Sequence, residues 1–250
     1  MTAGERYVVG QTLSDGWLGA VRLLHDTPGR KAVHLIVRIL EPTVEIEEIR
    51  VGAQALINAN NGDGEGAMPD IATTRNTIFP AAYARRTRSA EELAKYYRDR
   101  YAEFREFPKN ERGTYFGRIV AYPRADGEDP ADQLTDTVRK LRDELKSPSP
   151  KSSRYEINIY SERCDKSPMS FPCLAHLSVH LHQRRVHVQA IYRNESLIAR
   201  GYGNYLGLAE LQAYIAESAG AKVGELMITA GHAELDGLKR PITAMLKALA

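Results

Sequence analysis

Two alternating strands in the second half of the chain constrain its fold most. The segment Leu174–Arg193 reads LAHLSVHLHQRRVHVQAIYR, with apolar residues at every second position on both sides of Gln183 and Arg184. Such a pattern on both sides of a short polar turn predicts a β-hairpin. A lone hairpin is marginally stable in water, so we expect further strands and helices to cover its apolar face.

The rest of the chain alternates between helical and strand patterns. Ser89 and Glu92 form a capping-box pattern at the start of a charged helix that we expect to end near Glu106. The sequence further predicts helices over 13–25, 133–146 and 241–249, one helix ending at Gly220, strands over 32–40, 155–161 and 224–229, and a mobile surface loop over 58–70. This mixture predicts a single α+β domain, residues 1–250, in which helices flank a mixed β-sheet.

Composition excludes several classes of partner. The chain is 43% apolar and 26% charged, and its 34 Lys and Arg residues nearly balance its 32 Asp and Glu residues. The basic residues are scattered, which argues against a nucleic-acid polymer as partner. The sequence contains neither a signal peptide nor a membrane span, so we expect a cytoplasmic protein with reduced cysteines and no membrane partner.

Cys173 is a candidate nucleophile at one end of the hairpin. It follows Pro172 where the strand begins, and the hairpin brings the other end, with Arg193, back beside it. A neighbouring guanidinium favours the nucleophilic thiolate form. Asn204 stands at a turn before a helix, so it is either an N-cap or, with an amide donor and acceptor together, a group that binds the N3 and C4 edge of a pyrimidine.

Short motifs in one order resemble those of the thymidylate synthase-like family. The resemblance covers about residues 113–236 and keeps the family's spacings. It is carried by Tyr115-Phe116-Gly117-Arg118, Asp132-Gln133-Leu134, Ser152-Ser153-Arg154, Pro172-Cys173, Arg193-Asn194, Asn204, Gly224-Glu225 and Gly231 to Asp236.

The resemblance implies a thymidylate synthase-like fold and a covalent mechanism. The thiolate of Cys173 would add to C6 of a pyrimidine nucleoside monophosphate, and 5,10-methylenetetrahydrofolate would supply a one-carbon unit to C5. Arg193 would hold the 5′-phosphate, with Arg75 as a further candidate, and Asn204 would bind the base. The family also implies a homodimer packed sheet to sheet, in which Arg154 reaches the partner's phosphate.

Departures from the family pattern point to a variant substrate and product. Glu234 and Asp236 occupy the sugar-binding positions, and carboxylates suit the vicinal hydroxyls of a ribonucleotide. On the folate side, Phe116 replaces the family's proton-removing tyrosine and Ser196 replaces an aspartate that contacts the pterin. We therefore expect 5-hydroxymethylation, with a CMP-type ribonucleotide favoured, over 5-methylation.

Other functions stay open from the sequence. The chain could methylate dUMP as a thymidylate synthase proper, or bind nucleotide without catalysis. A metalloprotein is a further alternative, because four histidines alternate along the hairpin: His176, His180, His182 and His187. We favour an enzyme without a metal, and its acid–base glutamate could be any of Glu45, Glu47 and Glu48.

Overall fold

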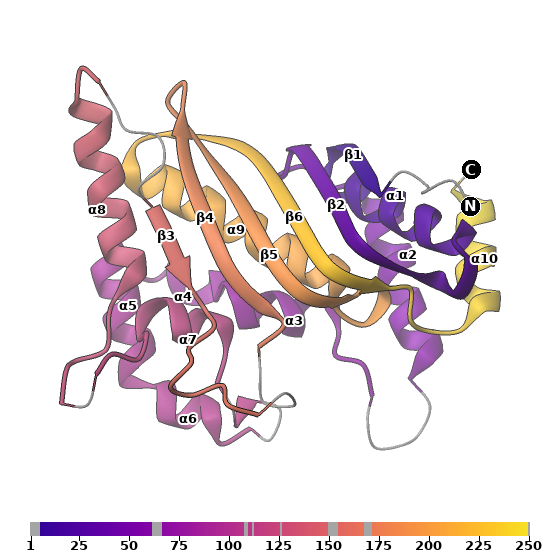
Figure 1. Ribbon diagram of the computed structural model, residues 1–250, viewed down its shortest axis with the longest axis horizontal. Coiled ribbons are helices and arrows are strands. Elements are labelled where there is room, and N and C mark those ends of the chain that lie inside the picture. The colour runs from indigo at the N-terminus through magenta and orange to yellow at the C-terminus, as the bar shows by residue number, and fades with distance from the viewer. Residues whose placement is uncertain are drawn as a thin grey trace. The chain divides into compact units, whose positions relative to one another are not determined.

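The computed structural model is a mixed α+β structure with a six-stranded mixed sheet flanked by helices (Figure 1). It describes residues 6–61, 67–107, 110–111, 113–125, 127–149, 155–167 and 172–249. The strands are β1 (Tyr7–Thr12), β2 (Lys31–Glu41), β3 (Tyr155–Asn158), β4 (Leu174–His182), β5 (Arg185–Ser196) and β6 (Lys222–Glu234), in the sheet order β1-β2-β6-β5-β4-β3. The strand β1 runs parallel to β2, whereas β6 is antiparallel to β2 and β3 is antiparallel to β4.

The helices lie between and after these strands. The α-helices are α1 (Leu13–Asp26), α2 (Glu47–Asn60), α3 (Ile71–Ile78), α4 (Ala81–Ala84), α5 (Ala90–Asp99), α6 (Tyr101–Arg105), α7 (Tyr115–Val120), α8 (Gln133–Lys146), α9 (Tyr202–Ala219) and α10 (Lys239–Ala248). A 3-10 turn, Pro28–Arg30, precedes β2, and a π-helical turn, Leu197–Gly201, joins β5 to α9.

By contacts, the chain divides into two compact units. Unit 1 comprises residues 1–75, 191–209 and 225–250, and unit 2 comprises residues 76–190 and 210–224. Strands β5 and β6 and helix α9 each contribute to both units, so the division crosses these elements instead of following a linker.

In unit 1, helix α1 packs closely against the two strands that surround it in sequence. Thr12 and Asp15 form a capping box at the start of α1. A side chain at Gly10 is impossible, because its Cβ would lie 2.2 Å from the backbone nitrogen of Gly16. This contact lets β1 lie directly on α1, and Trp17 of the same helix donates to the carbonyl of Leu197 at 2.9 Å.

A kink in the sheet of unit 1 changes which side chains are buried. His34 of β2 has a φ of +60° and lies between two paired positions, Val33 with His232 and Leu35 with Ala230. Along β6 the buried residues are Ala230 before the kink and Ala233 after it, so the alternation shifts by one residue. Beyond the kink, β6 therefore buries the side chains that an unbroken alternation would expose.

In unit 2, helices α5, α7 and α8 pack together, and α7 and α8 also pack against β3 (Figure 1). Their core is aromatic: the rings of Phe79 and Tyr97 meet the ring of Phe116 edge to face. Gln212 of α9 donates to the carbonyls of Val186 and Gly224, at 2.8 and 3.1 Å. One buried amide thus links α9 to both β5 and β6 within this unit.

The structure confirms the elements with the strongest patterns. The α8 bounds are those predicted, α1 differs by one residue, and the hairpin turns at Gln183 and Arg184, whose φ angles are 47° and 58°. The prediction of one long charged helix from Ser89 was wrong in one respect, because the helix breaks at Arg100 into α5 and α6. The prediction of a loop over 58–70 was wrong at its start, because the last turn of α2 continues to Asn60. Positions 62–66 lie outside the described residues.

Candidate functional site

The ends of β5 and β6 form a polar cluster in unit 1 that contains three predicted site residues. The hydroxyl of Ser196 donates to Oε1 of Glu234 at 3.2 Å. Asp236 accepts from the backbone N–H groups of Ile198 and Ala199, at 2.8 and 3.0 Å. The predicted folate-side serine and the two predicted sugar-binding carboxylates therefore lie together where β5 enters the π-helical turn.

These two carboxylates have different surroundings. Glu234 also lies 3.4 Å from the ammonium of Lys31, so it is part of a partly exposed ion pair. Burial raises the pKa of Asp236 above its ordinary value, and the two backbone N–H bonds only partly oppose that shift. The charge of Glu234 raises the pKa of Asp236 further, which means that the two carboxylates interact electrostatically. Asp236 has a structural role as the cap of the π-helical turn.

Asn204 lies in the first turn of α9, so its interpretation as an N-cap was wrong. Its side chain is 5% exposed, yet its amide makes no hydrogen bond with any residue that the structure describes. Neither polar atom of this amide is among the fully buried unpaired atoms, so the amide still reaches solvent. The side chain offers a donor and an acceptor together.

Helix α3, which carries the predicted phosphate-binding residue Arg75, approaches this turn through Thr74 and Ile71. A Cβ at Gly203 would lie 2.6 Å from Cβ of Thr74 and 2.9 Å from the carbonyl oxygen of Ile71. Only glycine allows this approach, so Gly203 fixes α3 against the residue next to Asn204. This contact joins segments that are far apart in sequence, and no local sequence pattern predicts it.

A second buried carboxyl lies beside the predicted site, and sequence reasoning missed it. Glu195 of β5 is 2% exposed and accepts from the hydroxyl of Tyr205 at 3.4 Å, while its Oε1 has no hydrogen-bond partner among the described residues. Burial raises the pKa of Glu195 to about 8. The carboxyl is therefore protonated at neutral pH and can act as a hydrogen-bond donor.

One of the three candidate glutamates is placed at the start of α9. The hydroxyl of Tyr202 donates to Oε2 of Glu45 at 3.0 Å and lies 2.8 Å from Oγ of Ser14. Glu47, in contrast, forms an exposed ion pair with Arg50. Among the acidic residues of this segment, Glu45 is thus the one connected to the helix that carries Asn204.

Cys173 belongs to unit 2 and lies directly before β4, where its side chain is partly exposed. The backbone around it is held by a clamp two residues further on, because the N–H groups of Ile159 and Tyr160 both donate to the carbonyl of Ala175 at 3.0 Å. A buried ion pair between Arg118 and Asp165, 2.7 Å apart, supports this clamp. Arg118 also donates to the carbonyl of Ile159.

The remaining predicted residues fall into three situations. Phe116 is fully buried among aromatic rings of unit 2, and so offers no surface to a ligand. Arg193 is an exposed residue of β5 in unit 1. Arg154 lies outside the described residues, and its predicted role stays a prediction.

Two histidines of the hairpin, His176 and His180, belong to a hydrogen-bonded row with Glu156 and Ser178. His176 contacts Oε2 of Glu156 at 2.5 Å and Oδ1 of Asn158 at 3.1 Å, while Ser178 connects Glu156 to His180. Within the described ranges, no group of three or more His, Cys, Asp or Glu residues is arranged to hold a metal ion. In the same ranges, no helix has the length and apolar character needed to cross a bilayer.

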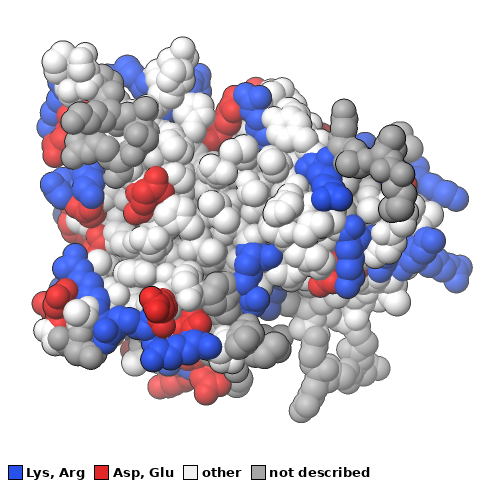
Figure 2. Space-filling model, in the orientation of Figure 1, with Lys and Arg blue, Asp and Glu red and all other residues white. Residues whose placement is uncertain are grey.

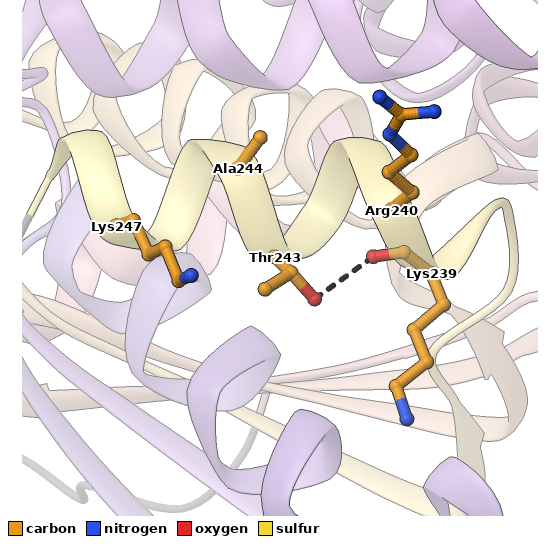
Figure 3. A pocket seen from close by; sticks show the side chains of 5 residues that line it. All are labelled: Lys239, Arg240, Thr243, Ala244 and Lys247. Atoms are coloured by element: carbon orange, nitrogen blue, oxygen red, sulfur yellow. Dashed lines mark hydrogen bonds between the residues drawn. The ribbon is translucent and has the colours of Figure 1, made fainter.

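One cavity, of about 480 Å³, lies along α10 (Figure 3). Its lining is Lys239, Arg240, Thr243, Ala244 and Lys247, and the hydroxyl of Thr243 donates to the carbonyl of Lys239. None of the residues that sequence analysis predicted for the site lines this cavity.

Comparisons with known proteins add no relative. No family model matches the chain, and no curated protein matches it.

Proposed function

We propose that this chain transfers a one-carbon unit from 5,10-methylenetetrahydrofolate to C5 of a pyrimidine nucleoside 5′-monophosphate. The observation that carries the proposal is that Asn204 is a largely buried residue whose amide has no partner among the described residues and can pair with the N3 and C4 edge of a pyrimidine. The ordered motifs around Cys173, Arg193 and Asn204 support the same assignment.

In this proposal Cys173 is the nucleophile. Its thiolate adds to C6 of the base, so that C5 becomes an enolate-like carbon able to attack an electrophile. Arg193 and Arg75 bind the phosphate through charge-assisted hydrogen bonds, as would Arg154 of a second copy. The clamp at Ala175 supports the assignment, because it holds the backbone beside the thiol.

The folate supplies the electrophilic one-carbon unit when it is bound. Of the two folate-side positions, Ser196 is partly exposed and its hydroxyl can still accept a hydrogen bond, whereas Phe116 is buried and serves as a wall. Because Phe116 carries no hydroxyl, another group must take the C5 proton. We assign that role to Glu45, whose link to Tyr202 supports a position near the base.

The product of this reaction is a 5-hydroxymethyl nucleotide. The C5 proton and the folate leave, water adds to the exocyclic methylene, and the Cys173 thiolate is released from C6. The substrate sugar is a ribose, because Glu234 can accept from vicinal hydroxyls. Asp236 takes part less directly, since both its oxygens already accept from backbone N–H groups. Methylation of dUMP and nucleotide binding without catalysis are the alternatives.

The proposal includes a homodimer that packs sheet to sheet. Three large apolar side chains of unit 1 strands are exposed: Tyr7 at 47%, Val9 at 51% and Val33 at 48%. In unit 2, the surface over β4 is largely uncharged (Figure 2). Exposed apolar strand residues of this kind mark protein interfaces.

Product analysis tests the proposal. The protein is incubated with methylenetetrahydrofolate and, separately, with CMP, dCMP, UMP and dUMP, and the nucleotides are examined by mass spectrometry. A gain of one CH₂O unit on CMP that disappears in Cys173→Ser supports hydroxymethylation, and a gain of one CH₂ unit on dUMP supports thymidylate synthesis. Absence of any product with all four nucleotides would contradict an enzyme and leave the non-catalytic alternative.

A further inference from the structure

Unit 2 contains a second cavity, of about 710 Å³, which includes none of the predicted site residues. It lies between the segment that joins α4 to α5, helix α8 and the second half of α9. Its volume is within the range of sites that bind small molecules. The whole lining belongs to unit 2, so the cavity is defined by one compact part of the chain.

Three arginines give this cavity its charge. Arg85, Arg88 and Arg142 all line it, and none of the three lies within 4.0 Å of a carboxylate oxygen among the described residues. Other arginines of unit 2 are paired: Arg98 with Asp132 and Arg139 with Asp136. Three guanidiniums around one hollow suit an oxyanion with several acceptor oxygens.

One of these arginines is held in place by the protein. The Nε of Arg142 donates to the carbonyl of Ser218 at 2.8 Å, which leaves its two terminal nitrogens for a ligand. The nearby carboxylate of Glu91 accepts from its own backbone N–H and from Ser89, and it also attracts the charge of Arg142 without forming an ion pair with it. A guanidinium that is already oriented loses less entropy when it binds an anion.

The remaining lining offers an aromatic surface and hydroxyl groups. The rings of Phe79 and Tyr214 lie 5.2 Å apart. Burial raises the pKa of Tyr214 above its ordinary value, so its hydroxyl keeps its proton and can donate. Two carboxylates, Glu210 and Glu217, also line the cavity, and they can accept from hydroxyl groups of a ligand.

We propose that this cavity binds a small phosphate monoester that carries hydroxyl groups. The three arginines face the lining carboxylates Glu210 and Glu217 and the nearby Glu91, so the positive charge is limited, which suits a monoester better than a polyphosphate. The glutamates match the hydroxyl-bearing part of the ligand, and the ring of Tyr214, which packs on Phe79, supports its apolar face. This site is separate from the residues assigned to one-carbon transfer, and it does not depend on that function.

Calorimetric titration of the full chain tests the site. The probes are ribose 5-phosphate, inorganic phosphate and ribose. We expect saturable binding of ribose 5-phosphate, weaker binding of inorganic phosphate and no binding of ribose. Arg142→Gln and Arg85→Gln should each weaken the binding of ribose 5-phosphate roughly tenfold or more, because each loses a charge-assisted hydrogen bond.

Matched variants test whether the phosphate probes bind in this cavity. Arg139 lies on the same helix as Arg142 but is already paired with Asp136. The variant Arg139→Gln should therefore bind ribose 5-phosphate like the unaltered protein. Arg193→Gln removes a phosphate-binding residue of the proposed nucleotide site and should also leave this binding unchanged. Arg85 makes no side-chain hydrogen bond with a described residue, so its variant stays informative if Arg142→Gln fails to fold. The proposal is overturned if no phosphate probe binds, or if only Arg193→Gln weakens binding.

Discussion

Replacing Glu195 by glutamine should make the protein's stability less sensitive to pH. The unfolded chain loses this proton near pH 4.5, whereas burial moves the pKa in the folded protein to about 8. Between these values the folded state holds one more proton than the unfolded state, so stability falls as pH rises, by about 1.4 kcal/mol per pH unit. The favourable contribution is complete below about pH 4.5 and is lost by about pH 8.

The magnitude follows from that window. From about pH 5 to about pH 8, the free energy of unfolding of the native protein should fall by about 3 to 4 kcal/mol more than that of Glu195→Gln. The glutamine is neutral throughout, and any constant cost of burying its amide cancels in the comparison across pH. Urea titrations at several pH values measure both proteins, with Glu217→Gln, an exposed position of α9, as the control. If the free energies of the native protein and Glu195→Gln run parallel across this range, the reasoning about Glu195 is refuted.

Three further substitutions test the packing around the proposed site. Asn204→Leu should change the free energy of unfolding by less than about 1 kcal/mol, because the amide has no described partner. Its nucleotide affinity, measured by calorimetry, should fall about tenfold. A large loss of stability would contradict the unpartnered amide. Asp165→Asn should cost about 3 kcal/mol in a urea titration, because it leaves the charge of Arg118 without its partner, and an unchanged midpoint would count against the buried pair. Gly203→Ala should cost about 2 kcal/mol, since its Cβ collides with Thr74, and a neutral result would show that α3 can move.

Local patterns were sufficient for elements whose signals lie within a few residues. Helix α8 was predicted with the right bounds, because Leu134, Val138 and Leu141 repeat at helical spacing and are all fully buried. The hairpin was predicted because its strands alternate and its turn is short and polar. In both cases the residues that decide the structure are neighbours in sequence.

Contacts between distant segments could not be predicted in this way. The kink at His34 depends on the pairing of β2 with β6, whose residues are about two hundred positions apart. The approach of α3 to Gly203 and the bond from Tyr202 to Glu45 also join remote parts of the chain. Strand β1 was missed, because its six residues lie directly before the much clearer pattern of α1.

The predicted site shows the same division. Sequence reasoning predicted Ser196 for the folate side and Glu234 and Asp236 for the sugar. The structure places all three in one cluster, where Ser196 donates to Glu234. It assigned Phe116 to the folate side from its motif alone, but its burial depends on helices that no motif describes. It passed over Glu195, since one acidic residue in a strand gives no sign that it will be buried.

The central claim is that Cys173 adds to C6 of a pyrimidine nucleotide, and exchange of the C5 proton tests it most directly. The protein is incubated in D₂O with CMP, dCMP, UMP and dUMP in turn, without folate, and the C5 proton is followed by NMR. The account predicts exchange with at least one nucleotide, most readily with CMP, and its loss in Cys173→Ser. Exchange that persists in Cys173→Ser, or the absence of exchange with all four nucleotides, would contradict the account.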